Sequence, residues 1–392
     1  MLFNQPKEPA KIALVLTGGG ARAAYQIGVL KAVMAHLPRN QKTPFKIICG
    51  TSAGAINAVT LSTHASCFHL GVKKAEWVWK NFSTDQVYAS TWRGVFSHLF
   101  KNFLSRFSKK GIDRATSLLN NEPLRNLLKQ VINFQRIDRN ILSGHLTAIS
   151  VSASSYSNGD SISFFQSSEG QEWKRAKRQG VKTVLTTRHL MASSAIPLMF
   201  PSIKIGESYY GDGAIHQLSP LSPAIHLGAD KILILGVEQP NQDKYYGQSE
   251  FHPNSAAITG HLLDTVFTDS MNADLERLER INKTLEYAPT EKTGLKHIDT
   301  LLINPSRNFN KLARHYYKNL SPAIKFLMRF FGVKQNEESA LLSYILFEKP
   351  FTEKLIQIGY EDGMERIDEI LEFLELGTAA ELKANLSKAK AK

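Results

Sequence analysis

A serine between two glycines has the residue types and spacing of a nucleophile for acyl transfer, in the segment Gly50-Thr51-Ser52-Ala53-Gly54. The segment follows a short apolar run and precedes a helical pattern, which is the context of a sharp strand-to-helix turn that exposes a serine hydroxyl. Gly50 and Gly54 suit such a turn because larger side chains would clash with the neighbouring strand and helix. The helix N-terminus behind Ser52 favours developing negative charge. A chance occurrence of the pattern is the alternative, and the strand–helix context argues against it.

A second candidate lies in a glycine-rich turn, Gly18-Gly19-Gly20-Ala21-Arg22-Ala23. Its spacing fits the dinucleotide fingerprint, but that fingerprint requires an acidic residue about 20 positions further on, and there is no Asp or Glu between Glu8 and Glu76. No Gly-Lys-Ser/Thr closes the turn as in a Walker A loop. A run of backbone N–H groups that can face an anion remains, and we expect Gly18, Gly19, Gly20, Ala21 and Arg22 to supply an oxyanion hole. A tightly packed helix-entry turn is the alternative.

The third candidate is Gly211-Asp212-Gly213-Ala214. A serine hydroxyl is a weak nucleophile and needs a base to remove its proton. Asp212 could be that base, or it could orient a histidine that is. Asp-Gly is also a common turn sequence, so this motif in isolation carries little weight.

Two strand–turn–helix units in succession must position the first two candidates. Residues 11–16 and 45–49 are short apolar runs that end at glycines, which is typical of buried strands. Apolar residues at helical spacing follow the first run until Pro38, and a second helix is predicted to begin near Ala53. Repeated units of this kind predict a parallel sheet covered by helices.

Further strands are predicted at residues 146–151, 162–165, 203–210, 231–237 and 301–303. Asn121-Glu122-Pro123 indicates a helix start, with proline near the first helical position. We expect a catalytic core at 8–240 with a helical insertion at about 75–135. A helical remainder at 241–375 then packs on this core or completes it, and a frayed basic tail follows at 376–392.

In this order, the three motifs resemble those of the patatin-like phospholipases. The segments 21–30, 189–197 and 230–237 are similar to the family as well. The resemblance spans about 10–240 and continues more loosely to about 370, where 358–363 is similar to a late family segment. It implies an α/β three-layer sandwich with a mostly parallel central sheet, a helical insertion and a helical C-terminal part.

The resemblance also implies a Ser–Asp dyad rather than a triad. Ser52 is then the nucleophile, and Asp212 is the base that later returns the proton to the leaving alcohol. Backbone N–H groups in the stretch 18–22 form the oxyanion hole, and Gly213 and Ala214 complete the Asp-Gly-Ala motif. Many members have glycine where this chain has Ala23, which leaves the set of oxyanion donors open.

From the residues alone, a Ser-Asp-His triad is the rival mechanism, since the chain has 12 histidines and His216 lies four residues beyond Asp212. No histidine stands in a recognisable triad context, so the dyad is the working hypothesis. The sequence contains no His-Glu-x-x-His and no calcium-binding loop, so we expect neither a metal nor a cofactor.

The formal net charge of +13 over 392 residues favours anionic partners. The two cysteines, Cys49 and Cys67, imply no disulfide framework. The first apolar run is too short for a signal peptide, and no apolar run is long enough to span a membrane. We therefore expect a cytoplasmic protein with peripheral membrane contact, and export by a route without a recognisable signal stays open.

Residues 92–110 combine aromatic residues at helical spacing with five Lys or Arg and no acid, which suits either an anionic lipid surface or a core-facing helix. Residues 323–331 have the same character. The basic cluster at 174–178 has no accompanying nucleic-acid motif, so no nucleic acid is expected as a partner. We expect a lipid or phospholipid ester as substrate. A non-enzymatic membrane- or nucleic-acid-binding protein on the same scaffold is the alternative, and the sequence does not indicate the oligomeric state.

Overall fold

The computed structural model describes residues 9–91, 117–240, 255–288, 290–335 and 337–390. The predicted amphipathic segment 92–110 lies outside the described residues. A mixed α/β architecture is built around one sheet with the strand order β10-β9-β1-β2-β3-β4-β6-β5, and β7 and β8 join it at β3. The strands are β1 (Ile12–Leu16), β2 (Ile47–Thr51), β3 (Ala148–Ser155), β4 (Ser161–Ser167), β5 (Trp173–Arg175), β6 (Arg178–Lys182), β7 (Ile203–Ile205), β8 (Ser208–Asp212), β9 (Lys231–Leu235) and β10 (Asp299–Ile303).

The centre of the sheet is parallel, because β10, β9, β1, β2 and β3 all run in the same direction. Antiparallel pairs occur only towards the β3 side, where β4, β5, β7 and β8 are added. The carboxyl ends of parallel strands meet at one edge, which is where ligands bind in open α/β sheets. The expectation of a mostly parallel central sheet is therefore confirmed.

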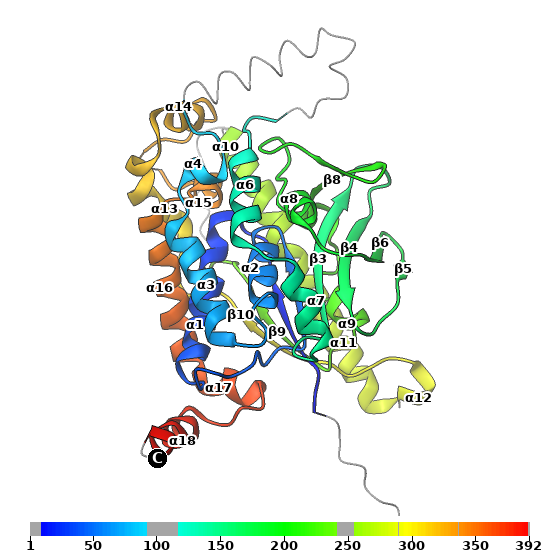
Figure 1. Cartoon of the computed structure of the whole chain (residues 1–392). Coiled ribbons are helices and arrows are strands. Elements are labelled where there is room, and N and C mark those ends of the chain that lie inside the picture. Colours follow the sequence, from blue (N-terminus) through cyan, green and yellow to red (C-terminus); the bar gives the residue numbers. More distant parts are fainter. Residues whose placement is uncertain (1–8, 92–116, 241–254, 289, 336, 391–392) are drawn as a thin grey trace, which may run out of the picture.

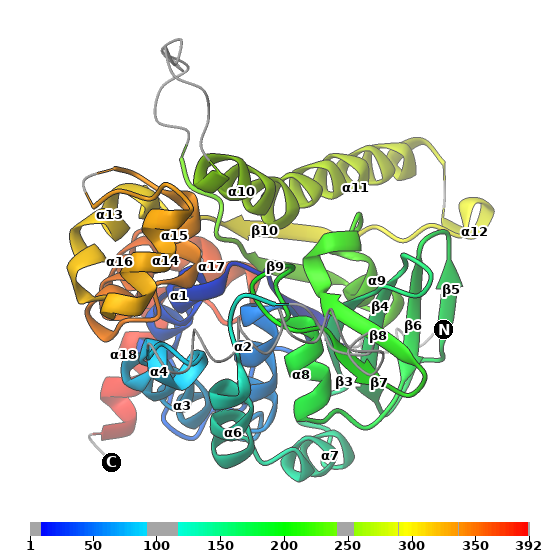
Figure 2. The same ribbon diagram turned by 90° about the horizontal axis from the view of Figure 1, so that it is seen from above.

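Helices cover both faces of the sheet (Figures 1 and 2). Alternate residues of β1 and β2 divide between two cores: Leu14 and Ile48 face the layer of α1 and α2, while Val15 and Cys49 face the layer of α9 and α11. The helices before the third motif are α1 (Ala24–Ala35), α2 (Ala53–Ser62), α3 (Phe68–Asn81), α4 (Thr84–Val87), α6 (Glu122–Val131), α7 (Gln135–Leu142) and α8 (Thr187–Ser193). Those after it are α9 (Ser222–His226), α10 (Ser255–Asp264), α11 (Ser270–Tyr287), α12 (Thr290–Thr293), α13 (Phe309–Tyr316), α14 (Pro322–Phe330), α15 (Ala340–Ile345), α16 (Lys349–Glu365), α17 (Ile367–Phe373) and α18 (Ala379–Lys390).

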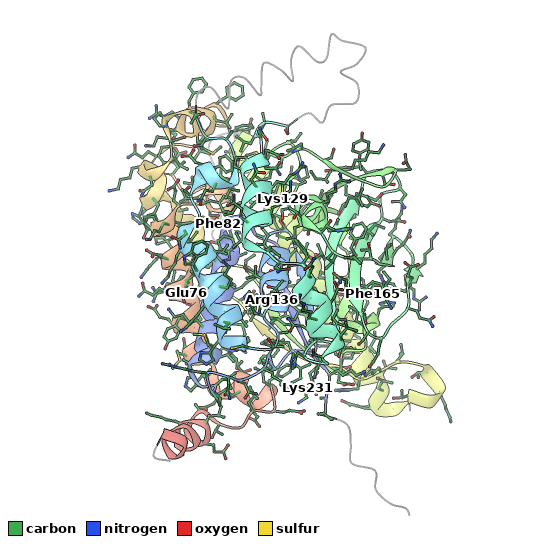
Figure 3. The ribbon with its side chains drawn as sticks, in the orientation of Figure 1. Glu76, Phe82, Lys129, Arg136, Phe165 and Lys231 are labelled. Atoms are coloured by element: carbon green, nitrogen blue, oxygen red, sulfur yellow. The ribbon has the colours of Figure 1, made fainter. Side chains whose placement is uncertain are left out.

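Helix α16 belongs to the core, although it lies far from the catalytic motifs in sequence. It packs along α1 so closely that a Cβ on Gly359 would lie 2.1 Å from the Tyr25 carbonyl oxygen, and one on Gly28 would lie 2.1 Å from that of Ile356. Gly28 and Gly359 are therefore required where the two helices touch. Gly359 belongs to the late segment, 358–363, that resembles the family. Helix α3 also packs against α1, and its Glu76 accepts from Lys31 of α1 at 2.8 Å (Figure 3).

Two local predictions need correction, and one hairpin was missed. Residues 203–210 do not form one strand, because Gly206 (φ +58°) turns the chain and β7 and β8 pair as a hairpin. The basic cluster at 174–178 lies in the hairpin β5–β6, which was not predicted. The C-terminal tail is helical as far as Lys390 rather than frayed. Each of these stretches is short and polar or basic, and its structure depends on a partner strand or helix that the local sequence does not reveal.

Candidate active site

Ser52 and Asp212 meet because β3 lies beside both of their strands. The last residue of β2, Thr51, pairs with Ser152 of β3, and Asp212 of β8 pairs with the next residue, Ala153. Strand β8 therefore occupies the edge of β3 where β2 stops. The Ser52 hydroxyl donates to Asp212 Oδ2 at 2.5 Å, and both residues are only 1% exposed. Two residues that are 160 positions apart in the sequence thus form a buried, hydrogen-bonded pair.

Ser52 stands on a strained turn. Its backbone has φ 55° and ψ −128°, in the region that non-glycine residues seldom adopt. Ser193 of α8 stabilises this turn, because its hydroxyl accepts the Ser52 N–H at 2.8 Å and donates to the Ser152 carbonyl at 2.6 Å. A Cβ on Gly54 would lie 2.3 Å from the Leu16 carbonyl oxygen, so glycine is required there. The turn has the geometry of a nucleophile elbow, with Ser52 immediately before α2.

Asp212 is buried, and its carboxylate has no cationic partner in the described residues. Burial raises the pKa of Asp212 to about 7, against smaller lowering effects from the Ser52 hydroxyl and the Ala214 N–H. That N–H donates to Oδ1 at 3.0 Å, so each carboxylate oxygen accepts one hydrogen bond. The next residue, Gly213, has no room for a side chain, since a Cβ there would lie 2.2 Å from the Ser152 carbonyl oxygen. The Asp-Gly-Ala motif therefore fixes the carboxylate by local geometry.

His216 does not join this pair. Its backbone N–H donates to the Ser154 hydroxyl at 3.1 Å, and its buried Nδ1 has no hydrogen-bond partner among the residues described. Both oxygens of Asp212 are already bonded to other groups. Within the described ranges, the geometry offers a serine–aspartate pair without a histidine.

The glycine-rich turn lies directly beside Ser52. A Cβ on Gly18 would lie 3.1 Å from the Ser52 Cβ, and Gly20 lines the same pocket as Ser52. In the part of the chain that the structure describes, the N–H groups of Gly18, Gly19, Gly20 and Ala21 donate to no protein acceptor. The N–H of the next residue, Arg22, donates to the Gly19 carbonyl at 3.0 Å, as the short 3-10 helix η1 (Gly20–Ala23) begins. Free donors are thus present, and they precede Arg22.

Arg22 lies in the turn that was expected to supply the oxyanion hole, but its side chain binds residues of the C-terminal helices. It is completely buried and donates to Ser343 (2.8 Å), Asp264 (2.8 Å) and Asn310 (2.8 Å), while its guanidinium lies 3.7 Å from the ring centre of Tyr344. These partners come from α10, α13 and α15. Arg22 therefore joins the glycine-rich turn to the C-terminal helices.

An apolar pocket adjoins Ser52. It is lined by Gly20, Ser52, Ala53, Ile56, Trp79, Phe82, Val87, Leu124, Ser194, Ile196, Phe200 and Phe347. Phe82, labelled in Figure 3, packs against Trp79 with ring centres 5.2 Å apart. Apart from Ser52, the one hydroxyl in this lining is that of Ser194, whose buried oxygen has no partner in the described residues. The lining has the apolar character that an acyl chain requires, but its open volume is about 20 Å³, so a chain could enter only if the lining side chains move apart.

Comparison with protein-family models identifies the family of this chain. The family model described as patatin-like phospholipase matches residues 14–225, and this range contains the glycine-rich turn, Ser52 and Asp212. The chain belongs to the patatin-like phospholipase family. The resemblance stated from the sequence is thereby confirmed, and family membership supports a hydrolase of lipid esters.

Two solved structures align with the patatin-like chain along most of its length. One is VipD from Legionella pneumophila, with 13% identity, 92% of this chain and 67% of that chain covered, and a TM-score of 0.39. The other is the type III effector protein ExoU, with 16% identity, 86% of this chain and 77% of that chain covered, and a TM-score of 0.28. Comparison with curated proteins finds no match.

Sequence reasoning about the patatin-like domain missed the residues that support its site. Ser193 lies in the segment 189–197 that resembles the family, yet a serine in a helix gives no local sign that its hydroxyl accepts the Ser52 N–H. Phe267 packs against the turn, and its ring would touch a Cβ on Gly18 at 2.5 Å. It lies in a π-helical segment, η4 (Thr265–Asp269), and such segments are frequent at functional sites.

Two further features concern metals and membranes. Among the described residues, no three His, Cys, Asp or Glu side chains come close enough together to hold a metal ion. Nor does any helix in the described ranges combine the length and apolar character needed to cross a bilayer.

Proposed function

We propose that this protein is a serine-dependent lipid acyl hydrolase, of the phospholipase A or lysophospholipase type, that cleaves carboxylic esters through an acyl-enzyme on Ser52. The observation that carries the proposal is the 2.5 Å hydrogen bond from the Ser52 hydroxyl to Asp212 Oδ2 in a buried site. A nucleophile needs a base within hydrogen-bond reach, and Asp212 meets that requirement.

In the proposed reaction, Ser52 Oγ attacks the ester carbonyl carbon while Asp212 Oδ2 takes its proton. The carbonyl oxygen becomes an oxyanion, which accepts hydrogen bonds from the N–H groups of Gly18, Gly19, Gly20 and Ala21, and Arg22 contributes by holding this turn in place. Collapse of the intermediate releases the alcohol, which receives the proton from Asp212. Water then attacks the acyl carbonyl carbon and gives a proton to Asp212. The second intermediate collapses by breaking the bond to Ser52 Oγ, which takes that proton back from Asp212, so the fatty acid is released and both residues return to their starting state.

The pKa of Asp212 supports its role as the base. An ordinary aspartate, with a pKa near ~3.9, takes a proton too reluctantly at neutral pH to activate a hydroxyl well. Burial raises the pKa to about 7, and this value matches the base to its working pH. Because the site excludes water, the hydrogen bonds to a developing charge are also stronger than in solvent.

The substrate proposal rests on the pocket beside Ser52. Its aromatic and aliphatic lining, with Phe82, Leu124 and Phe200 among its members, supports an acyl chain as the group next to the reacting carbonyl. We propose phospholipids and lysophospholipids as the substrate class, reached by peripheral contact with an anionic membrane. The non-enzymatic alternative, a membrane- or nucleic-acid-binding protein, finds no particular support in this pocket.

A chromogenic ester assay tests the proposal. We expect the full-length protein to hydrolyse a short-chain ester, and Ser52→Ala to abolish this turnover. His216→Ala is the matched control, because it removes a nearby side chain with no contact to the pair, and it should keep activity close to that of the unchanged protein. Turnover that persists in Ser52→Ala, or its absence in the unchanged protein, would overturn the proposal. Equal collapse in His216→Ala would exclude the dyad but not the hydrolase.

A further inference from the structure

The stretch between Asp299 and Glu337 contains no Asp or Glu, and its basic residues are Arg307, Lys311, Arg314, Lys318, Lys325, Arg329 and Lys334. Two of these are neutralised in the fold: Arg307 pairs with Glu361 at 2.8 Å, and Lys334 pairs with Glu337 at 2.9 Å. The other five have no carboxylate partner among the described residues. The stretch folds into α13, the 3-10 turn η5 (Tyr317–Asn319) and α14, so the excess positive charge is concentrated on one part of the surface.

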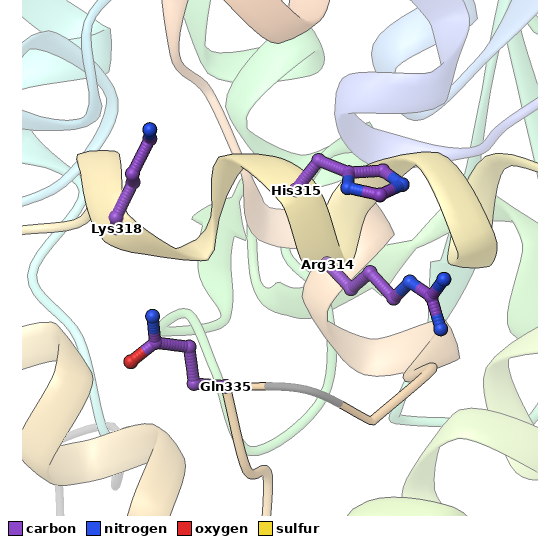
Figure 4. A pocket seen from close by; sticks show the side chains of 4 residues that line it. All are labelled: Arg314, His315, Lys318 and Gln335. Carbon is purple, nitrogen blue, oxygen red and sulfur yellow. The ribbon is translucent and has the colours of Figure 1, made fainter.

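Part of this charge lines an open cavity of about 420 Å³ (Figure 4). Arg314 and His315 stand on α13, Lys318 stands on η5, and Gln335 faces them from the segment after α14. Guanidinium, ammonium and amide groups are the donors that bind phosphate oxygens. The last turn of α13 favours cations by itself, which accounts for Arg314 and His315, but not for Lys318 beyond the helix end or for Gln335 across the cavity. The cavity shares no lining residue with the pocket beside Ser52.

Helix α14, next to this cavity, has two different faces. Ala323, Ile324, Leu327 and Met328 are buried, so this side of the helix faces the core, which is one of the two alternatives that the sequence left open. On the other side, Phe326 is 53% exposed and Phe330 is 78% exposed, and Arg329 is exposed beside them. Exposed aromatic rings between cations are the composition of helices that lie in a membrane interface. The Lys325 ammonium donates to the Lys318 carbonyl at 2.7 Å, so the aromatic face and the cavity form one surface.

This surface is connected to the wall of the substrate pocket. The Ser321 hydroxyl, at the start of α14, donates to the Ser90 carbonyl at 2.8 Å. Two residues earlier, Tyr88 packs its ring 6.0 Å from that of Phe200 and 6.4 Å from that of Phe347, and both of these rings line the pocket. Figure 1 shows α14 and α4 at the same end of the molecule. A membrane held by α14 would therefore lie at the end of the molecule where the pocket wall is anchored.

We propose that Arg314, Lys318, Arg329 and Phe330 form a docking surface for an anionic lipid bilayer. The cations contact lipid phosphates, with Gln335 as an additional donor, and the Phe330 ring enters the boundary between head groups and acyl chains. The assignment of this surface rests on the proposed function, because it brings the pocket to its lipid substrate. The net charge of +13 supplies long-range attraction, and these residues orient the contact.

Vesicle sedimentation tests the docking surface without interference from turnover, if all proteins carry Ser52→Ala. The probes are phosphatidylcholine vesicles with and without phosphatidylserine. We expect Arg314→Gln with Lys318→Gln to weaken binding to the anionic vesicles on the order of tenfold at moderate salt, an effect that high salt removes. The matched control, Lys174→Gln with Arg175→Gln on the β5–β6 hairpin, changes the charge by the same amount on exposed residues and should leave binding unchanged. Phe330→Ser should weaken binding at both salt concentrations, since its contribution is apolar.

Equal weakening by the two double variants would overturn the proposal in favour of a general effect of net charge, and no weakening by the first would overturn it outright. Thermal unfolding of each variant verifies the fold. We expect unchanged midpoints, because Lys174, Arg175, Lys318 and Phe330 are exposed and the half-buried Arg314 has no carboxylate partner among the described residues. A parallel assay with Ser52 intact separates this proposal from the proposed function. If the Arg314/Lys318 variant binds vesicles normally and the unchanged protein hydrolyses a soluble ester, only the docking surface fails. If the unchanged protein shows no turnover but the variant loses vesicle binding, only the hydrolase fails.

Discussion

Nη1 of Arg22 lies 2.8 Å from Oδ1 of Asp264, and the same carboxylate oxygen accepts from the Tyr344 hydroxyl at 2.8 Å. A residue of the glycine-rich turn is thus tied to the last residue of α10, immediately before the π-helical segment that carries Phe267. Phe267 in turn packs against Tyr344, with ring centres 5.2 Å apart. The C-terminal helices therefore fix the turn beside Ser52 through one buried cation.

Replacing Arg22 by Gln should lower stability, because the shorter side chain cannot reach three acceptors. Asp264 then loses its cation and keeps only the Tyr344 hydroxyl as a donor, and Asn310 keeps only the Ser343 hydroxyl. Asp264 is partly exposed, so we expect a loss of about 1–3 kcal/mol in the free energy of unfolding rather than the larger cost of a fully buried pair. Thermal or urea unfolding measures it. Arg280→Gln, which removes an exposed arginine from a surface pair with Glu276, is the control and should stay within about 0.5 kcal/mol of the unchanged protein. Equal stability of the two variants would contradict the role given to Arg22.

The rate of ester hydrolysis should depend on the protonation of Asp212. The base must be ionised to accept the Ser52 proton, so kcat/KM should fall as the pH drops through the pKa of about 7. A histidine base would titrate at nearly the same pH, so the value alone does not separate the two mechanisms. The temperature dependence does, because a carboxyl group ionises with little enthalpy and an imidazole with much more. An apparent pKa that moves strongly with temperature would contradict Asp212 as the titrating group.

The same burial makes Asp212 a source of instability. Its pKa is raised in the folded protein, so the folded state holds the proton more tightly than the unfolded chain does. Stability relative to a neutral residue is therefore lost as the pH rises from about 4, where the unfolded aspartate ionises, to about 7, and the loss stays constant above that. Asp212→Asn should consequently gain in unfolding midpoint relative to the unchanged protein across this range. If the unfolding midpoints of the two proteins changed with pH in parallel, folding would not raise the pKa of Asp212.

Gly213→Ala should reduce activity by a large factor, because the added Cβ would lie 2.2 Å from the Ser152 carbonyl oxygen and must displace the residue next to Asp212. Gly71→Ala is the matched control. It adds the same methyl group in the interior of α3, where the nearest atom is 3.3 Å away, and alanine favours a helix. Steady-state kinetics on a soluble ester, with circular dichroism to verify folding, compare the two. Full activity of Gly213→Ala would show that the Asp-Gly-Ala geometry is not critical.

The sequence singled out Ser52 and Asp212, which the fold brings into hydrogen-bond contact, and it predicted much of the sheet, because those signals are local. Ser52 and Asp212 each lie in a short motif at a strand end, and the glycines around them are required by contacts within a few residues or with the adjacent strand. Ser193 and Arg22 show the limit of this reading. Their functions depend on partners 141 and 242 positions away, and neither residue type indicates which partner it will meet. The hairpins β5–β6 and β7–β8 escaped prediction because short, half-exposed strands carry little apolar pattern.

Covalent labelling with a fluorophosphonate, which reacts with activated serine hydroxyls, tests the central claim most directly. Mass spectrometry of the digested protein should show one added phosphonyl group, on the peptide that contains Ser52. The label should be absent in Ser52→Ala, much slower in Asp212→Asn and unchanged in His216→Ala. Label on another residue, or rapid labelling that survives the loss of the Asp212 carboxylate, would contradict the account.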